Sequence, residues 1–464
     1  MTLNDYKFPG VPKPFEHQIE TTKFIVENER CFVLNDIGTG KTWSAVWAID
    51  YLMQTGKIRN VLIIAPVSTL EIVWARTFFH LNNHDIMTTV LTGTAAKKNA
   101  QFGMQQFVSK YKVSIVNPES LHIIADNPYL SEYDMILVDE SAGFRNATRN
   151  KCKTLAKICQ KIPRVVMQTG SPTPEAPTDI WATARIIAPK RVPRFFGQFR
   201  DITMRKTSQF KWTALPEAAE IIANALKGFV IRYERDECID LPESLHHTLE
   251  LEPTRQQTKM IREMRKFAVS EYEDNTVSAP NEAVVISKIL QIASGAVKFA
   301  DGDDSGVIDV DCKSKFDALQ DILTASTQPV IVFAPFKAAI RKIADFFSGK
   351  IPYSVVSGDT PASERMQVFD SLQSGMIRLL IAHPEAMSHG ISLTHSNVIV
   401  WWTPVYSHET YEQANGRITR PGQIRNQYVI HLTCSALEQK VISKLEGKSQ
   451  LQGTLLEYLQ RQSI

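Results

Sequence analysis

Short, wholly apolar runs recur along the chain, and helical patterns separate them. A run that is apolar on both faces is typical of a strand in a parallel sheet, because helices cover both faces of such a sheet. The predicted strands of the first half are Cys31–Leu34, Val61–Ala65, Val113–Val116, Met135–Val138 and Val165–Gln168. Those of the second half are Val330–Ala334, Tyr353–Val356, Leu379–Ala382, Val398–Trp401 and Tyr428–Leu432. Predicted helices such as Thr42–Met53 and Ala338–Phe347 alternate with them. The pattern therefore predicts two doubly wound α/β sheets.

The pattern changes between the two halves. Residues 189–302 show mostly helical patterns, including Arg255–Tyr272 and Glu282–Ser294, with polar breaks at Asp274–Asn281 and Ala300–Gly306. At 464 residues the chain exceeds what one hydrophobic core usually organises. We expect an N-terminal α/β lobe over residues 1–190, a helical insertion and linker over 191–305, a C-terminal α/β lobe over 306–445 and a helical tail over 446–464.

Composition narrows the class of protein only a little. Hydrophobic residues make up 44% and charged residues 22%, as in ordinary globular proteins, and the net charge of +3 does not by itself indicate a nucleic-acid partner. The six cysteines are scattered without a CxxC pair, which favours free thiols in a reducing compartment. No run approaches the ~18 apolar residues of a membrane helix, and no apolar signal core begins the chain. We expect a cytoplasmic protein without a membrane partner.

A glycine-containing loop, N-D-I-G-T-G-K-T over residues 35–42, follows the first predicted strand and precedes a helix. Phosphate binding needs a turn whose backbone N–H groups converge, and glycines let that backbone approach closely. Lys41 would reach the β/γ-phosphates, and the Thr42 hydroxyl would hold Mg²⁺. The full pattern has glycine where Asn35 stands, so the flanking strand and helix favour an ATP site over a plain glycine turn. The expected nucleotide-binding residues here are Gly38, Thr39, Gly40, Lys41 and Thr42.

Two carboxylates end the predicted strand Met135–Val138. Asp139 is placed to hold the metal ion, and Glu140 to orient or deprotonate the attacking water. Ligands of doubly wound sheets bind beyond the carboxyl ends of the strands, where both side chains would lie. An acidic pair also occurs as a solvated start of a loop. The phosphate-binding pattern upstream is what favours a catalytic role for both residues.

Two arginines of the second half, Arg417 and Arg420, lie three residues apart and so share one helical face. An arginine supplied across a domain boundary stabilises the charge on a transferring phosphoryl group. The alternative, a solvated basic helix end, explains neither the flanking Gln413 and Gln423 nor the Trp401-Trp402 pair that precedes them. We therefore expect both arginines to be catalytic and to bind the nucleotide.

Together these elements resemble superfamily 2 helicases, and more closely the Swi/Snf-type translocases, in the right order over nearly the whole chain. Three positions depart from the family pattern: Asn35 stands for the usual Asp, Ala142 for the common His, and Glu175 for the usual Asn. The change at Ala142 puts in doubt one link between the acidic motif and the rest of the site. The matching segments are Lys13–Gln18, Asn35–Thr42, Ala65–Trp74, Asp139–Asn146, Thr169–Thr173, Ser388–Thr394 and Gln413–Gln423.

The resemblance implies an α/β fold of two RecA-like doubly wound lobes with a helical insertion between them. ATP and Mg²⁺ would bind in the cleft, with Gln18 on the adenine and Gly390 also on the nucleotide. Closure would bring the arginine-finger pair, Arg417 and Arg420, onto the γ-phosphate, and each cycle would shift one lobe along a strand. By motif position, backbone-phosphate contacts would come from Ser68, Thr69, Ser392 and Thr394, and such contacts read no sequence.

The most basic stretch runs from Lys190 to Trp212, with aromatic residues between its charges. Arg194 and Arg200 would meet phosphates there, and the Phe195-Phe196 pair would stack on bases or act as a wedge at a fork. An amphipathic helix with buried aromatics and solvated charges explains the same pattern equally well. Both interpretations stay open at this point.

The function implied is a DNA-stimulated ATPase that moves as a monomer along duplex or branched DNA with little sequence specificity. A true helicase that separates strands is the nearest alternative. An RNA helicase is disfavoured because Thr169-Gly170-Ser171-Pro172 differs from the Ser-Ala-Thr form of RNA-dependent relatives. A non-catalytic binding protein would not need Lys41, and a protein-remodelling ring ATPase would not need a second lobe. The compact chain resembles a phage or mobile-element member acting in a bacterial host.

Overall fold

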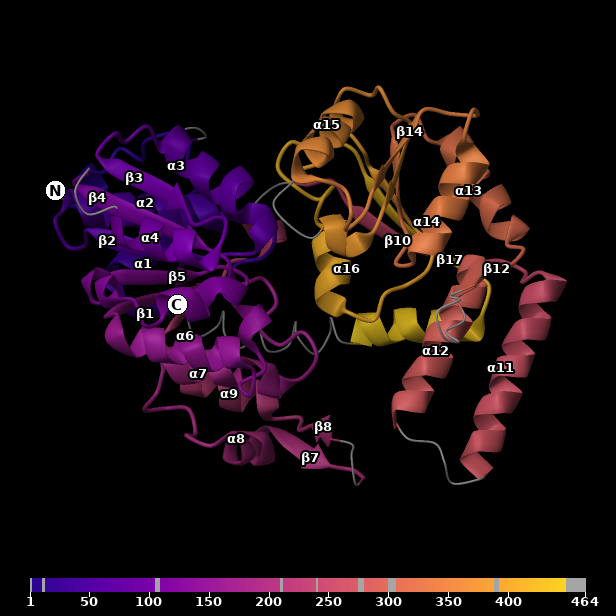
Figure 1. The fold of residues 1–464 in the computed structure, drawn as a ribbon, viewed down its shortest axis with the longest axis horizontal. Coiled ribbons are helices and arrows are strands. Elements are labelled where there is room, and N and C mark those ends of the chain that lie inside the picture. The colour runs from indigo at the N-terminus through magenta and orange to yellow at the C-terminus, as the bar shows by residue number, and fades with distance from the viewer. Residues whose placement is uncertain are drawn as a thin grey trace. The chain divides into compact units, whose positions relative to one another are not determined.

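The structure is a computed structural model that describes residues 2–10, 13–104, 109–208, 212–238, 241–273, 279–298, 306–387 and 392–447. Its contacts divide the chain into two compact units, with residues up to 240 in the first and residues 241–447 in the second. Each unit is built around one parallel sheet (Figure 1). The division falls inside the segment expected to be an insertion, because residues as far as 238 pack with the first sheet.

The first unit contains a seven-stranded sheet of order β3-β4-β2-β5-β6-β1-β9, and every neighbouring pair is parallel. Five of its strands lie where the apolar runs predict them. The other two, β3 and β9, are edge strands, and neither carries a long apolar run. The strands are β1 Arg30–Val33, β2 Asn60–Ile64, β3 Ile86–Val90, β4 Tyr111–Val116, β5 Met135–Val138, β6 Arg164–Gln168 and β9 Val230–Ile231.

Alternate residues of the first sheet enter two separate apolar cores. Phe32 and Leu62 belong to the core on one face, whereas Val33 and Ile63 belong to the core on the other. This alternation follows from the two-residue period of a strand, and it confirms a sheet covered on both faces. The helices are α1 Glu16–Glu27, α2 Lys41–Gln54, α3 Arg76–Leu81, α4 Ala95–Met104, α5 Leu121–Ile124, α6 Asn150–Lys161, α7 Trp181–Ile187, α8 Phe196–Thr203, α9 Ala218–Leu226 and α10 Arg235–Cys238.

The second unit contains a six-stranded parallel sheet of order β10-β17-β16-β13-β15-β14. Five strands again lie at the predicted apolar runs. The edge strand β10 was not predicted, because most of its side chains are exposed and polar. The strands are β10 Ser244–Glu250, β13 Val330–Phe333, β14 Tyr353–Val356, β15 Leu379–Ala382, β16 Val398–Trp401 and β17 Gln427–Thr433. Two RecA-like doubly wound sheets are therefore confirmed.

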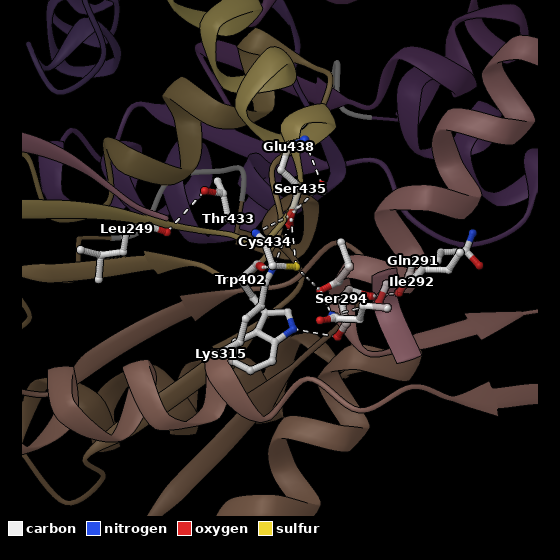
Figure 2. Close-up of polar contacts among 12 residues, drawn as sticks. Leu249, Gln291, Ile292, Ser294, Lys315, Trp402, Thr433, Cys434, Ser435 and Glu438 are labelled. Atoms are coloured by element: carbon white, nitrogen blue, oxygen red, sulfur yellow. Dashed lines mark hydrogen bonds and ion pairs between the residues drawn. The ribbon is translucent and has the colours of Figure 1, made fainter. Parts of the chain in front are cut away.

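The second unit also carries a pair of long helices, α11 and α12, that run side by side (Figure 1). The end of α12 is fastened to the sheet, because the Trp402 indole donates to the Ser294 carbonyl at 2.9 Å (Figure 2). The helices are α11 Arg255–Glu273, α12 Ala279–Ser294, α13 Lys313–Ala325, α14 Lys337–Phe347, α15 Ala362–Gln373 and α16 His408–Asn415, with a further helical stretch over 436–447.

A buried ion pair supports this fastening. The Lys315 ammonium lies 2.7 Å from a Glu438 carboxylate oxygen, and both side chains are fully buried. Lys315 also donates to the Trp402 carbonyl at 2.6 Å, and Glu438 accepts from the Cys434 backbone N–H at 2.9 Å (Figure 2). Helix α13, the end of β16 and the start of the 436–447 helix are thereby joined at one point.

The part of the chain that the structure describes contains neither a membrane-spanning helix nor a cluster of metal ligands. Within the described ranges, no helix combines the length and the apolar character needed to span a bilayer. In the same ranges, no three His, Cys, Asp or Glu side chains gather as a metal-binding cluster would require.

Candidate functional site

Three functional loops begin side by side at the carboxyl edge of the first sheet. Strand β6 lies between β5 and β1, with Val33 opposite Gln168 and Val138 opposite Met167. The loop after β1 carries the glycine pattern, the loop after β5 carries Asp139, and the loop after β6 begins at Thr169. The sheet thus brings together the loops that the sequence placed far apart.

The glycine loop takes the conformation that a phosphate-binding turn needs. Gly38 and Gly40 have φ values of +93° and +81°, in the left-handed region that disfavours other residues. A Cβ atom on Gly40 would lie 2.1 Å from the Gln18 amide nitrogen, so no side chain fits at this position. The Lys41 ammonium donates to the carbonyl oxygens of Asn35 at 2.8 Å and Asp36 at 3.0 Å. Thr42 follows as the second residue of α2.

Gln18, the residue expected on the adenine, is buried against this loop. Its amide nitrogen donates to the Thr39 carbonyl at 3.0 Å, and its amide oxygen accepts from the Phe15 backbone at 3.1 Å. A His17 ring nitrogen lies 2.8 Å from the same Thr39 carbonyl. Burial lowers the pKa of His17 despite this hydrogen bond, so the ring is neutral at physiological pH and its Nε2–H is the donor.

Three residues outside the glycine loop hold it in place: Thr21, Tyr233 and Arg232. Asn35 uses both ends of its amide: the nitrogen donates to the Thr21 hydroxyl at 2.9 Å, and the oxygen accepts from the Tyr233 N–H at 3.0 Å. Asp36 pairs with the buried Arg232 guanidinium at 2.9 Å. The departure from glycine at Asn35 is therefore a buried structural amide, and no local sequence pattern marked Arg232.

Three donors hold the Asp139 carboxylate. One of its oxygens accepts from the Trp74 indole at 2.9 Å, and the other accepts from Gln168 at 2.9 Å and from the Glu140 backbone at 3.0 Å. Trp74, at the end of the matching segment Ala65–Trp74, is fully buried, and its indole points to Asp139.

Glu140 lies in a strained backbone conformation beside the matching segment Thr169–Thr173, which is called the coupling motif below. Its φ of +48° is in the left-handed region, which is rare for glutamate and recurs at functional sites. The Thr169 hydroxyl donates to its carboxylate at 3.4 Å. A Cβ on the next residue, Gly170, would lie 3.1 Å from the Ile37 side chain, so the coupling motif also packs on the glycine loop. Thr169 and Gly170 thus contact the acidic motif and the glycine loop respectively.

The predicted strand-contacting residues of the first unit differ in accessibility. Ser68 is exposed, whereas Thr69 is buried and its hydroxyl donates to the Pro66 carbonyl at 2.9 Å. In the basic stretch, the Arg200 guanidinium lies 3.9 Å from the Trp212 ring centroid and pairs with Asp201 at 3.0 Å. Arg194 is exposed.

The Phe195-Phe196 pair is exposed by 61% and 43% respectively. It is therefore on the surface at the start of α8, which argues against the amphipathic-helix alternative for these two rings. The basic residue Lys211 lies outside the described residues.

In the second unit, Arg417 and Arg420 follow helix α16. The Arg417 Nε donates to the Gln413 carbonyl at 2.8 Å, and the Arg420 Nε donates to the Gly416 carbonyl at 3.1 Å. Burial lowers the pKa of Arg420 to about 10, which leaves it protonated at neutral pH. The Leu393 N–H donates to the Arg417 carbonyl at 2.9 Å, so two motifs of this unit are in contact.

The remaining residues of the second-unit motif vary in position. Ser392 is exposed and Thr394 is partly buried. Gly390, expected to bind nucleotide, lies outside the described residues.

Helix α16 is fixed on the sheet by buried polar contacts that the sequence did not reveal. The Tyr411 hydroxyl lies 3.0 Å from His431 Nε2 and 3.3 Å from His246 Nδ1. The Trp401 indole donates to Asn415 at 3.0 Å. Burial lowers the pKa of His431 to about 4, so this ring is neutral. These contacts set the direction in which the chain leaves α16 toward the arginines.

Comparisons with known proteins show which family the chain is similar to. A model of the SNF2-related domain matches residues 17–298, and one of the helicase conserved C-terminal domain matches residues 314–422. Protein p41 of Acyrthosiphon pisum secondary endosymbiont phage 1 is 25% identical, covering 97% of this chain and 99% of that protein.

Larger relatives match over part of their length. The SWI/SNF-related matrix-associated actin-dependent regulator of chromatin subfamily A-like protein 1 of Xenopus laevis is 20% identical over 92% of this chain. An uncharacterized ATP-dependent helicase of Mycoplasma genitalium is 22% identical over 98%. The chain spans 42% and 43% of those two proteins. A solved Sulfolobus solfataricus SWI2/SNF2 ATPase core in complex with dsDNA aligns over 100% of this chain and 99% of that chain, with 17% identity and a TM-score of 0.45.

Proposed function

Because this chain belongs to the SNF2-related family and is thus an ATP-dependent nucleic-acid motor of superfamily 2, we propose that it is a DNA-dependent ATPase that moves along duplex DNA. The observation that supports this most is the meeting of three loops at one sheet edge, where Lys41, Asp139 and Glu140 can serve one triphosphate. Such an edge is where doubly wound sheets bind nucleotides.

In this proposal the first unit binds and activates the nucleotide. On nucleotide binding, the Lys41 ammonium exchanges its hydrogen bonds to the loop carbonyls for hydrogen bonds to the β/γ-phosphates. Gln18 binds the adenine. Asp139 and Thr42 fit a Mg²⁺ ion. Asp139 offers a buried carboxylate that is already oriented, and Thr42 offers a hydroxyl beside the glycine loop. The ion would neutralise phosphate charge. Glu140 accepts a proton from the attacking water.

The second unit supplies Arg417 and Arg420 to the same triphosphate. Their support is the motif match and the buried contacts that hold α16. We expect Lys41→Ala, Glu140→Gln and Arg420→Ala each to abolish hydrolysis while circular dichroism and unfolding stay near wild type. Arg425→Ala, in the loop that follows, is the matched control and should retain turnover. An Arg420→Ala enzyme with near-normal turnover would remove the arginine pair from its assigned role.

Duplex DNA is the proposed track. The Xenopus relative is named a regulator of chromatin, in which the nucleic acid is duplex DNA. Ser68, Ser392 and Thr394 are proposed to contact backbone phosphates, and Thr69 through its backbone since its hydroxyl is engaged. Phosphate contacts carry no base information, so binding has little sequence specificity and weakens steeply with salt.

Movement along duplex without strand separation is the favoured activity. A triplex-displacement assay tests it: ATP should drive release of a third strand, and Lys41→Ala should not. Strand separation, or remodelling of branched DNA, is the second candidate, favoured by the exposed Phe195 and Phe196 beside Arg194. Unwinding of a forked duplex that Phe195→Ala and Phe196→Ala abolish would establish the second candidate instead.

The protein is further proposed to act as a monomer in the cytoplasm of a bacterial host. The similarity to p41 over 99% of that phage protein supports this setting. A single species of monomer mass in light scattering, with and without DNA, is the expected result.

A further inference from the structure

The carboxylate assigned to the metal ion is oriented by donors from two other segments. Trp74 Nε1 lies 2.9 Å from Asp139 Oδ2, and Gln168 Nε2 lies 2.9 Å from Asp139 Oδ1. Trp74 is fully buried and Gln168 is 1% exposed. Hydrogen bonds from neutral donors to a buried carboxylate are among the stronger ones, because the surroundings screen them little. The pair therefore fixes the plane of the Asp139 carboxylate.

Orienting the Asp139 carboxylate leaves a polar atom of Gln168 unsatisfied. Within the described residues, its buried amide oxygen has no hydrogen-bond partner. A buried acceptor left unsatisfied is unfavourable, and a leucine would fill the same space without that penalty. The N–H of Gln168 on Asp139 is thus the physical reason for an amide at this position.

Trp74 belongs to an unusual element that begins at the predicted strand-contacting residues. A short 3₁₀ turn, η2, spans Val67–Thr69 and is followed without a break by a π-helix, η3, over Leu70–Ala75 and then by α3. The exposed Ser68 lies at the start of this helical run, and Trp74 lies near the end of its π-helical part. Helices with π geometry are rare and recur at functional sites. Ser68 and Trp74 therefore lie on one continuous helical run.

We propose that Trp74 is a positioning residue through which the strand-contacting segment sets the orientation of Asp139, and hence the grip on Mg²⁺-nucleotide. This inference rests on the proposed function, since it assumes that Asp139 holds Mg²⁺ and that Ser68 meets a strand. Strand engagement would move η2 and η3, and the indole N–H would re-aim the carboxylate. DNA binding and metal–nucleotide binding would then be coupled through one hydrogen bond.

The test is Trp74→Phe, which keeps an apolar ring and removes the N–H donor. The readout is the Mg²⁺ ratio, defined as the dissociation constant of ADP in EDTA divided by that in Mg²⁺. Both constants are measured by titration calorimetry, with and without duplex DNA. Partners that orient a metal ligand typically contribute about 10- to 100-fold in metal affinity, so this ratio should fall about tenfold. Duplex DNA should change the ratio for wild type and leave it unchanged for the variant.

The chain contains a matched control in Trp47. This residue is also fully buried in the same apolar core, and its indole donates at 2.8 Å to the Pro9 carbonyl, away from Asp139. Trp47→Phe removes the same atoms and should lower stability similarly, yet keep the Mg²⁺ ratio and its response to DNA. Equal ratios for Trp74→Phe and Trp47→Phe would overturn the inference.

Two further measurements separate the possible failures. If Trp74→Phe does not fold, incorporation of 3-benzothienylalanine at position 74 replaces only the N–H with sulfur and keeps the shape. A wild-type-like Mg²⁺ ratio in that protein overturns the inference. Wild-type protein that binds ADP equally well in Mg²⁺ and EDTA would instead contradict the proposed function, because Asp139 would then hold no metal ion.

Discussion

The buried pair of Lys315 and Glu438 gives a sharp prediction for the second unit. Lys315→Met removes the cation but leaves Glu438 buried, where its donors among the described residues are Cys434 and Ser435. Removing one partner of a buried ion pair typically costs about 3–5 kcal/mol, because the remaining charge has lost its compensation. For a unit of this size, that corresponds to a fall in its melting temperature of roughly 6–20 °C.

The pH dependence of this cost follows from the same geometry. Burial alone would lower the pKa of Lys315, but the Glu438 charge and hydrogen bond outweigh it, and the net shift is upward. A raised lysine pKa stabilises the folded state fully below the unfolded value, near 10.5, and the contribution disappears only as pH rises through the folded value. The stabilisation that the Lys315 ammonium contributes should therefore be constant from pH 6 to about 9.

Hydrogen exchange measured by mass spectrometry on the full chain is the suitable assay, since peptides from β17 and the 436–447 helix report the second unit alone. Lys315→Met should lower their opening free energy by about 3–5 kcal/mol. In a double-mutant cycle, Lys315→Met/Glu438→Leu should recover about 2–3 kcal/mol relative to the sum of the single changes. A loss of opening free energy below about 1 kcal/mol, or strictly additive effects of the two substitutions, would contradict a stabilising ion pair between Lys315 and Glu438 (Figure 2).

Three further predictions concern the first unit. Lys112 is 3% exposed and donates to the Phe102 carbonyl at 2.8 Å, and burial lowers its pKa to about 8. Its folded pKa lies below its unfolded value, so wild-type stability should rise between about pH 8 and 10.5, and urea titrations of Lys112→Met should lack that rise. Asn35→Asp should cost about 1–3 kcal/mol, because a carboxylate cannot donate to the Thr21 hydroxyl; unchanged urea midpoints would contradict this. Gly40→Ala should abolish ADP binding in calorimetry, since the new Cβ meets Gln18 in a positive-φ turn, whereas Gly56→Ala, with φ of +71° and open space, should lose only about 1 kcal/mol of stability. Equal ADP affinity in both glycine variants would contradict the steric argument.

Most of the fold was predictable from apolar runs, because strands buried on both faces carry no polar alternation. The ten predicted strands all lie at observed strands of the two sheets. In the two parallel sheets, the strands that were missed are β3, β9 and β10. They lie at sheet edges, where side chains such as Thr88 and His247 are partly or fully exposed. A strand half in solvent has no long apolar run to reveal it, and β9 is too short for any pattern.

The nucleotide loop and the acidic motif were also predictable, because their chemistry is local in sequence. The residues that support them were not. Trp74 meets Asp139 across 65 positions, and Arg232 meets Asp36 across 196. Such contacts arise only when the sheet folds, so the sequence does not show that the Trp74 indole reaches Asp139. The tyrosine and histidine contacts behind α16 were hidden for the same reason.

The most direct test of the central claim is steady-state ATP turnover by the wild-type chain, measured in parallel without nucleic acid and with single-stranded DNA, duplex DNA, forked DNA and RNA. We expect low basal turnover, strong stimulation by duplex DNA that Glu140→Gln eliminates, and little stimulation by RNA. Turnover that no DNA stimulates, or that RNA alone stimulates, would contradict a DNA-dependent motor.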